Sequence, residues 1–314
     1  MKAGRISKLR IGTRRSRLAV AQAEEVAHRL LALGVDTELV PIVTAGDRGA
    51  PATASPAGLK GLFVAEIVRA LQDGEVDLAV HSAKDLPSDD PPGVVVGAVP
   101  ERADPFDVLV TREGRPIEPG MAIGTSSLRR RAQLLRAHPG VEVRELRGNV
   151  DTRLAKLDAG VVDAVVLASA GLERLGLTVA NAVPLPLEEM VPAPGQGALA
   201  VQVRATGGGD DGIREAIGLL DHPRSRQAFE SERALVARLG GGCALPLGAY
   251  AEARAEGIRM LAVVIRPDGS DLVWAQAEAP TAEEVALEAG DILAAGGARE
   301  ILAALNASAF EAGG

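Results

Sequence analysis

The chain has 314 residues, of which 47% are hydrophobic, 24% are charged and 2% are aromatic, and its formal net charge is −8. This balance is ordinary for a folded protein and excludes a chain that is mainly disordered. The length predicts two or three domains. Because aromatic rings are scarce and the pI is near 5.2, the composition argues against a protein that binds nucleic acid.

The amino-terminal residues carry positive charge but no uninterrupted apolar stretch, so we expect no secretory signal. No apolar run approaches the ~20 residues that a membrane-spanning helix needs. The single cysteine, Cys243, fits a reducing compartment. We therefore expect a cytoplasmic protein that does not bind membranes.

Short apolar runs alternate with segments of helical period through the first 200 residues. This rhythm predicts parallel sheets with helices on their faces, in two α/β units of about a hundred residues each. Ser16 is a predicted helix cap, and Gly34 and Gly74 are predicted helix ends. The predicted strand segments are 8–12, 37–43, 76–82, 121–126, 141–146 and 162–171, and the predicted helical segments are 16–34, 61–74, 127–140 and 150–160.

Two proline-rich stretches, 89–93 and 185–197, are predicted to cross between domains, and the apolar strand 198–204 could return to the first sheet. After residue 220 the pattern changes to a helix, three strands and a long alanine-rich helix, which predicts a small α+β domain with an antiparallel sheet. The predicted domains are 1–100 with 198–217, 104–194 and 221–314.

Four arginine-bearing turns fall where strands give way to helices, at 12–17, 124–131, 147–153 and 171–176. Ligands of open α/β sheets bind at the carboxyl ends of strands, where helix amino termini attract anions, and arginine matches carboxylates in a bidentate manner. A single cluster could equally be a solvated helix face. The recurrence of four predicts a cleft for a polyanion.

The run VHSAKDLP at 80–87 places Lys84 and Asp85 just after an apolar strand. A fixed carboxylate at this edge could stabilise a cationic intermediate or transfer protons, although a capping aspartate beside a surface lysine is the plainer interpretation. The four histidines show no ligand spacing, so we expect no metal site.

Cys243 follows Gly240, Gly241 and Gly242. The glycines suit a thiol on an accessible turn, which is where reactive cysteines are found. A buried cysteine that behaves as a small hydrophobic residue remains the alternative.

These motifs, in this order, resemble the porphobilinogen deaminase (hydroxymethylbilane synthase) family, and the resemblance covers essentially the whole chain. The matching segments are IGTRRSRLA, GLKGLF, AVHSAKDLP, ADPFDVL, GTSSLRR, LRGNVDTRL, AGLERLGL, APGQGA and GGCALPLGAYA.

The resemblance implies an α/β fold with two periplasmic-binding-protein-like domains plus a small C-terminal α+β domain. It implies a monomeric transferase that joins four porphobilinogen molecules, with loss of ammonia, into the linear tetrapyrrole hydroxymethylbilane. Cys243 would carry a dipyrromethane cofactor through a thioether, and Asp85 matches the catalytic aspartate of the family.

Further residues match the family by position. The implied cofactor contacts, besides Cys243, are Lys84, Ser82, Ser127, Arg129, Arg130 and Arg147. The implied substrate contacts are Arg14, Ser16, Phe63, Arg153, Arg174 and Gln196.

The chain departs from the family pattern at Pro56, Arg17 and Phe106, where a lysine, a proline and an arginine are common. Pro56 falls in a loop, 44–60, that is expected to act as a lid over the cleft. The alternative function is a non-catalytic binder of small dicarboxylates, since the fold alone does not separate the two. The absence of an export signal, the third domain and Cys243 after its glycines favour the enzyme.

Overall fold

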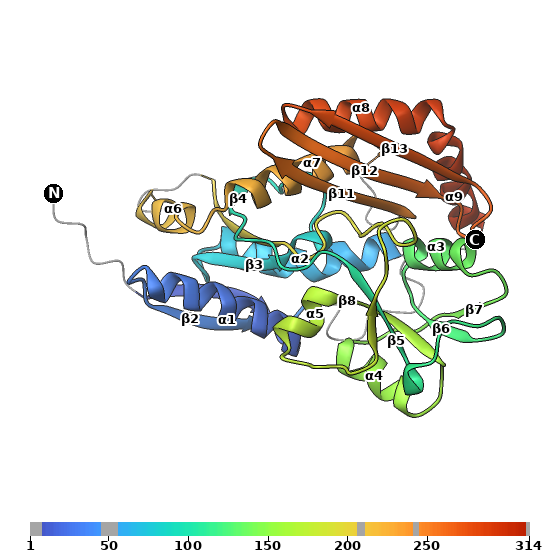
Figure 1. Cartoon of the computed structure of the whole chain (residues 1–314). Helices are drawn as coiled ribbons and strands as arrows, with labels where there is room; N and C mark the ends of the chain where they lie inside the picture. Colours follow the sequence, from blue (N-terminus) through green and yellow to red (C-terminus); the bar gives the residue numbers. More distant parts are fainter. Residues whose placement is uncertain (1–7, 45–55, 206–210, 241–244, 312–314) are drawn as a thin grey trace.

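The structure is a computed structural model that describes residues 8–44, 56–205, 211–240 and 245–311, without the side chains of 56–63 and 306–311. Its strands form three sheets, two of five strands and one of three (Figure 1). Each sheet carries helices, so the chain is a mixed α/β protein with two sheet-and-helix domains and a small C-terminal unit. The expected fold class is confirmed at this level.

The first sheet has the strand order β2-β1-β3-β10-β4. Local signals account for its helices: the Ser16 side chain accepts a hydrogen bond from the amide of Ala19 at the start of α1, and Gly34 follows that helix with φ +79°. The strands are β1 (Leu9–Arg14), β2 (Thr37–Ile42), β3 (Leu78–Ser82), β4 (Val94–Ala98) and β10 (Leu199–Arg204), and the helices are α1 (Arg17–Ala32), α2 (Pro56–Gln72) and α6 (Asp211–Gly218).

The expected parallel pairing is confirmed for the strands that the sequence predicted in the first two domains, but each of the two sheets also contains antiparallel pairs. In the first sheet β1 pairs in parallel with β2 and β3, but β10 runs antiparallel to β3 and β4, with Leu199 opposite Ser82. The cause is the path of the chain, because β10 enters this sheet from the second domain and not through a helix of its own. The expected return of residues 198–204 to the first sheet is confirmed.

The second sheet has the order β7-β6-β8-β5-β9, and β5 runs antiparallel to β8 and β9. Ser127 and Asn149 cap the first turns of its two longer helices through their side chains. The strands are β5 (Asp107–Thr111), β6 (Ala122–Gly124), β7 (Glu142–Arg144), β8 (Ala164–Ala168) and β9 (Ala182–Pro184), and the helices are α3 (Leu128–Ala137), α4 (Val150–Asp158) and α5 (Ser169–Arg174).

Two segments join the two sheets, residues 99–106 before β5 and residues 185–198 before β10. The predicted crossing at 89–93 is wrong, because these residues connect the short helix η2 (Ala83–Asp85) to β4 within the first sheet. A second short helix, η3 (Arg112–Gly114), follows β5.

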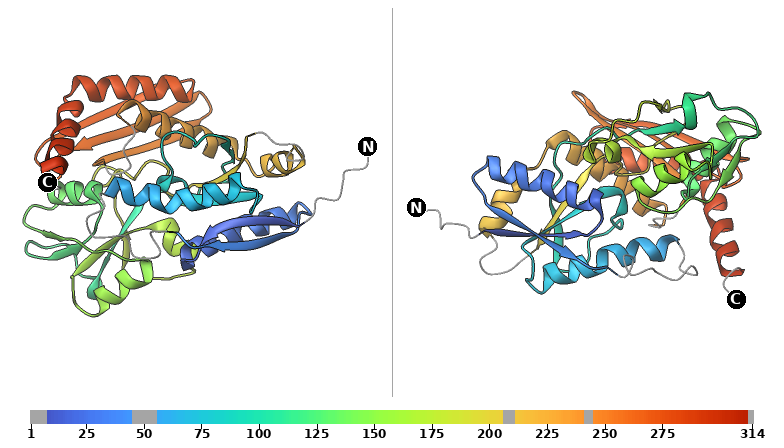
Figure 2. Two further views of the ribbon diagram at one scale, coloured as in Figure 1. Left: turned by 180° about the vertical axis from the view of Figure 1, so that it is seen from behind. Right: turned by 90° about the horizontal axis from the view of Figure 1, so that it is seen from below.

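The third unit is an antiparallel sheet of β11 (Leu247–Arg254), β12 (Gly257–Ile265) and β13 (Leu272–Ala279). One face packs on α7 (Pro223–Arg238) and α8 (Ala282–Ala295) through buried side chains such as Leu235 and Val285. The opposite face meets Ala132 of α3, so the unit rests on the second domain (Figure 2).

The single long carboxy-terminal helix of the prediction is instead two helices, α8 and α9 (Ala298–Glu311). Gly296 and Gly297 separate them, and Gly297 has φ +95°, a left-handed conformation that ends an α-helix. Within the described residues, no helix has the length and apolarity to cross a membrane.

Candidate active site

A first pocket, which we call the Asp85 pocket, opens at the carboxyl ends of β1 and β3. These strands are parallel neighbours, so the residues that follow them meet at one edge of the sheet. Arg14 and Ser16 come from the end of β1, and Ser82, Lys84 and Asp85 come from the end of β3. The full lining is Arg14, Ser16, Leu18, Ala19, Gln22, Val64, Ile67, Val80, His81, Ser82, Lys84 and Asp85.

The backbone that carries Asp85 is fixed by the segment that returns from the second domain. The amide of Ala83 donates to the carbonyl of Ala198 at 3.0 Å. Gly195 has φ +74°, and a Cβ there would lie 2.9 Å from the carbonyl carbon of Ala83. Only glycine permits this approach, so η2 is held against the crossing segment.

His81 lies on β3 beside this pocket and is 6% exposed. Burial lowers the pKa of its imidazole to about 4, and the nearby Asp85 carboxylate opposes the shift. The imidazole is therefore neutral at neutral pH, and it contributes shape and polarity rather than charge.

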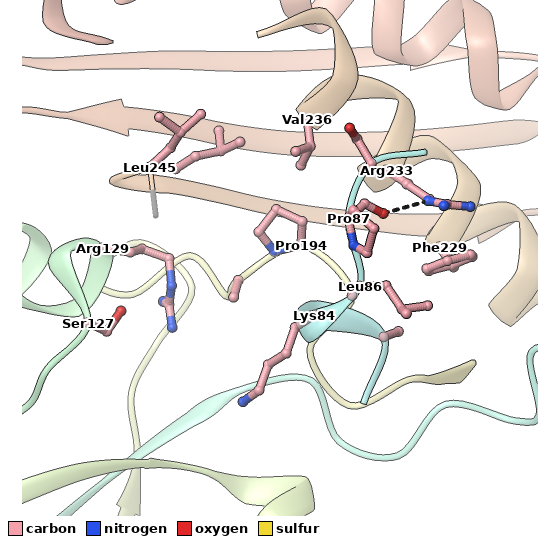
Figure 3. A pocket seen from close by; sticks show the side chains of 15 residues that line it. Lys84, Leu86, Pro87, Ser127, Arg129, Pro194, Phe229, Arg233, Val236 and Leu245 are labelled. Carbon is pink, nitrogen blue, oxygen red and sulfur yellow. Dashed lines mark hydrogen bonds between the residues drawn. The ribbon is translucent and has the colours of Figure 1, made fainter. Parts of the chain in front are cut away.

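A second pocket, which we call the Arg129 pocket, lies between η2, the start of α3, the crossing segment and α7 (Figure 3). It is open to solvent, and the empty space within it, open solvent included, is about 670 Å³. Lys84, Ser127 and Arg129 line one side, whereas Phe229, Val236 and Leu245 line the other. Arg233 of α7 lies on the second side as well (Figure 3), where it donates to Asp90 at 2.8 Å, so this side is apolar except for one paired cation.

Buried contacts fix the two consecutive arginines at the start of α3. Arg129 and Arg130 are 4% and 6% exposed, and both pair with the fully buried Asp107 at the start of β5. Burial disfavours the ionised carboxylate, but the two guanidinium groups outweigh it and lower the pKa of Asp107 to about 2. For Arg129 burial disfavours the charged guanidinium and so lowers its pKa, and the negative charge of Asp107 opposes that shift.

Gln196 of the crossing segment connects the two pockets. Its amide nitrogen donates to Oδ1 of Asp107 at 3.0 Å, and its amide oxygen accepts from Nζ of Lys84 at 3.5 Å. Lys84 lines both pockets. The predicted contacts Lys84, Arg129 and Gln196 therefore come together in space although they are far apart in the sequence.

Four predicted arginines line neither pocket: Arg130, whose guanidinium is bound by Asp107 and the carbonyl of Val166, and Arg147, Arg153 and Arg174. Arg147 pairs with Glu145 on the surface, with 54% of its side chain exposed. Arg153 donates to the carbonyl of Gly148, and burial, together with Arg130, lowers its pKa to about 10.

Arg174 is used in a contact between the first two domains. It donates to Glu25 of α1 at 2.9 Å and to the carbonyl of Gly197 at 3.0 Å. Its side chain is 6% exposed, so in this structure its guanidinium is bound to protein atoms.

Two predicted site residues cannot be placed. Cys243 lies outside the described residues, as does most of the predicted lid (45–55), and the side chain of Phe63 is not described. Leu245, two residues after Cys243, lines the Arg129 pocket. Within the described residues, no group of three or more histidine, cysteine or acidic side chains could hold a metal ion.

Sequence reasoning missed two buried acids near the pockets, Asp107 and Glu232. Asp107 falls within the segment ADPFDVL, where it received no role. Glu232 of α7 is fully buried, pairs with Arg102 at 2.8 Å and accepts the amide of Gly195 at 2.6 Å. The sequence signal for Glu232 is an acidic residue at a helix position where the pattern expects an apolar one. This signal does not identify its partner Arg102, which lies 130 positions earlier in the sequence.

The geometry agrees with the comparisons to known proteins. A family model described as "Porphobilinogen deaminase, dipyromethane cofactor binding domain" matches residues 9–211, and one described as "Porphobilinogen deaminase, C-terminal domain" matches residues 227–295. The curated porphobilinogen deaminase of Syntrophotalea carbinolica is 46% identical over 307 residues, which is 96% of each chain. That of Brevibacillus brevis is 42% identical over 307 residues, or 95% of this chain and 97% of its own.

Among solved structures, a periplasmic substrate-binding protein of an ABC transporter from Coxiella burnetii matches with a TM-score of 0.39 and 16% identity. The match covers 69% of this chain and 94% of that one, and a likeness at this level carries no argument about function. The two family models, by contrast, cover both α/β domains and most of the third unit, and relatives align almost end to end. The chain belongs to the porphobilinogen deaminase family.

Proposed function

We propose that this chain performs the reaction of its family, the assembly of hydroxymethylbilane from four molecules of porphobilinogen with release of four molecules of ammonia. The observation that carries the proposal is that the carboxylate of Asp85 lies in a pocket beside Arg14 and Lys84. This is the arrangement expected for a substrate that carries carboxylates and passes through a cation.

The dipyrromethane cofactor of the family has four carboxylates on two flat pyrrole rings, and the residues of the Arg129 pocket fit such a group. Lys84 and Arg129 are cationic, Arg233 is paired with Asp90 at 2.8 Å, and none of the described residues that line the pocket is acidic. Nε of Arg129 is buried and has no hydrogen-bond partner among the described residues. A buried donor of this kind is stabilised by an acceptor from a ligand.

We propose that Cys243 holds this cofactor through a thioether, with Lys84, Ser82, Ser127, Arg129, Arg130 and Arg147 as its contacts. When bound, the cofactor supplies a pyrrole whose free α-carbon is the first nucleophile. Leu245, two residues after Cys243 in the sequence, lines the wall of this pocket.

Asp85 is the proposed catalytic residue. Loss of ammonia breaks the carbon–nitrogen bond of the aminomethyl group and leaves a cationic methylene pyrrolenine. The Asp85 carboxylate stabilises this cation through the pyrrole N–H. After the new carbon–carbon bond forms, the carboxylate assists removal of the α-proton from the attacked ring. Water adds at the end, so four substrates and one water give one tetrapyrrole and four ammonia molecules.

The substrate carboxylates are assigned to cations of both domains. Arg14 lies beside Asp85, and the Ser16 side chain caps the amino terminus of α1, where backbone N–H groups favour anions. Phe63, Arg153, Arg174 and Gln196 complete the proposed set. For Arg174 the proposal requires that its contact with Glu25 is exchanged for substrate.

Several features follow from the sequence and the family and remain proposals. These are the domain limits 1–100 with 198–217, 104–194 and 221–314, the monomeric state, the cytoplasmic location and the absence of nucleic-acid and membrane partners. The membership of β10 in the first sheet supports the first limit.

The test combines mass spectrometry with turnover. The wild-type protein should carry an excess mass of two condensed pyrrole units on Cys243 and should convert porphobilinogen into hydroxymethylbilane. Cys243→Ala should fold but carry no such mass. A wild type that neither gains mass on incubation with porphobilinogen nor releases product would favour the dicarboxylate-binding alternative.

Asp85→Asn should keep the primer but lose most turnover, because the amide cannot balance the charge of the cation. The matched control is Asp89→Asn, since Asp89 is exposed four residues further on and lines neither pocket. Near-normal turnover by Asp85→Asn would remove this residue from its proposed role.

A further inference from the structure

One buried carboxylate holds the two arginines at the start of α3. Oδ1 of Asp107 accepts from NH2 and Nε of Arg130 at 2.7 and 3.2 Å, and Oδ2 lies 2.8 Å from NH2 of Arg129. Charge-assisted contacts of this length to a planar guanidinium fix its orientation as well as its position. Asp107 therefore fixes the guanidinium plane of Arg130, and it holds Arg129 close through an ion pair that lacks hydrogen-bond geometry.

Backbone carbonyls complete the support of these two side chains. NH1 of Arg129 donates to the carbonyl of Val191 at 2.6 Å, and NH1 of Arg130 donates to that of Val166 at 2.8 Å. Each guanidinium is thus held on two sides by protein. Nε of Arg129, buried and without a described partner, belongs to the one arginine of the pair that lines the pocket in Figure 3.

Asp107 is also connected to the loop that carries Asp85. The amide nitrogen of Gln196 donates to Oδ1 of Asp107 at 3.0 Å and to the carbonyl of Pro105 at 2.8 Å. Its amide oxygen faces Nζ of Lys84 at 3.5 Å. A continuous polar path therefore joins Lys84 in the first domain to the two arginines in the second.

Without Asp107, the positive charges of the surrounding guanidinium groups would repel one another. Arg130 acts on Arg153 as well as on Arg129, and the pKa of Arg153 is lowered to about 10 by burial and by Arg130. With Asp107 in place, a net positive charge remains for an anion, but the guanidinium groups stay in fixed positions. Such preorganisation lowers the cost of ordering side chains when a ligand binds.

We propose that Asp107 is a positioning residue for the reaction, which holds Arg129 where it receives a pyrrole carboxylate, with Arg130 as a buried support, and connects it through Gln196 to Lys84. This inference rests on the proposed function, because it takes a pyrrole carboxylate as the ligand of Arg129. Asp107 itself does not touch substrate.

The experiment compares Asp107→Asn with Asp163→Asn in the holoenzyme. Asp163 is a matched control because its Oδ2 accepts a backbone hydrogen bond from Ala122 at 2.8 Å in the same sheet and contacts no arginine of the site. For each variant we would measure the melting temperature, the fraction carrying the primer by intact mass, and KM and kcat for porphobilinogen. Asp107→Asn should raise KM by about tenfold or more and lower the primer fraction.

The control separates positioning from stability. Asp163→Asn should lower the melting temperature yet keep KM within about twofold of wild type. The combined variant Asp107→Asn with Arg129→Gln should raise KM by less than the product of the two single effects, because Asp107 acts through that arginine. Effects that multiply would overturn the proposal.

The variant Asp107→Glu separates the effect of the carboxylate's charge from that of its position, because it keeps the carboxylate but moves it by one methylene group. It should also raise KM, and it serves as the test if Asp107→Asn does not fold. A KM unchanged in Asp107→Glu, or lowered in Asp107→Asn, would mean that the residue merely balances charge.

The proposed function and the positioning role of Asp107 are refuted by different results. A wild-type protein that makes no hydroxymethylbilane would overturn the proposed function. A wild type with normal turnover, beside an Asp107→Asn variant whose KM and primer fraction are unchanged, would overturn only the positioning role.

Discussion

The burial of His81 makes a specific prediction about acid stability. In the folded chain the pKa of this imidazole is about 4, against an ordinary value of 6.5, because burial disfavours the charged form. The unfolded chain therefore binds more protons between these two values. Stability due to His81 is present above about pH 6.5 and is lost as the pH falls toward 4.

The size of the effect follows from linkage. At pH 5 an unfolded chain with the ordinary pKa holds almost one proton on this histidine, and the folded chain holds about a tenth of one. Integration from pH 7 to pH 5 gives a loss of about 2 kcal/mol in the free energy of unfolding. Asp107 does not contribute in this interval, because its lowered pKa of about 2 affects stability only below roughly pH 4.

The assay is urea unfolding, followed by far-ultraviolet circular dichroism at pH 7 and pH 5. His81→Gln carries no proton at either pH, so its loss between the two should be about 2 kcal/mol smaller than that of wild type. Any cost of the substitution itself cancels in this difference. His28→Gln, at an exposed position on α1, controls for the removal of a histidine and should keep the wild-type loss. The reasoning fails if wild type and His81→Gln lose the same free energy between the two pH values.

Two further predictions concern the crossing segment. Glu232→Gln leaves the buried guanidinium of Arg102 without its carboxylate and should lower the free energy of unfolding by about 3 kcal/mol in urea, whereas an effect under 1 kcal/mol would contradict the importance of this pair. Gly195→Ala must place a Cβ 2.9 Å from the backbone of Ala83 at φ +74°, and it should cost about 2 kcal/mol and reduce kcat by shifting η2. Normal turnover and stability in that variant would show that η2 does not depend on this contact.

The secondary structure was largely predictable because its signals are local. The first helix was predicted at 16–34 and is observed at Arg17–Ala32, since its cap and its terminal glycine lie in the same short stretch of sequence. The parallel pairing of the predicted strands was also correct, but the direction of β10 was not predictable in this way. Whether β10 runs parallel or antiparallel depends on which domain the chain comes from, and no residue within the strand carries that information.

The candidate site, too, was predictable from the sequence only in part. The sequence predicted that arginines would gather at the carboxyl ends of strands, and Arg14 and Arg129 do lie in the two pockets. It did not predict how they are held. Arg174 pairs with an acid 149 positions away and Arg130 with one 23 positions away, and spacing gives no sign of either partner.

The segment 193–198 explains how these distant pieces form one site. Gly195 donates its amide to Glu232 of the third unit, Gln196 reaches Lys84 and Asp107 of the first two domains, and the carbonyl of Gly197 accepts from Arg174. A Cβ at Gly197 would lie 2.5 Å from the carbonyl oxygen of Ala103, so the two crossing segments touch here along their backbones. Because these contacts are buried and partly charged, separating the domains at this point would expose unpaired groups at high cost. Relative motion of the first two domains is therefore expected to pivot about this segment.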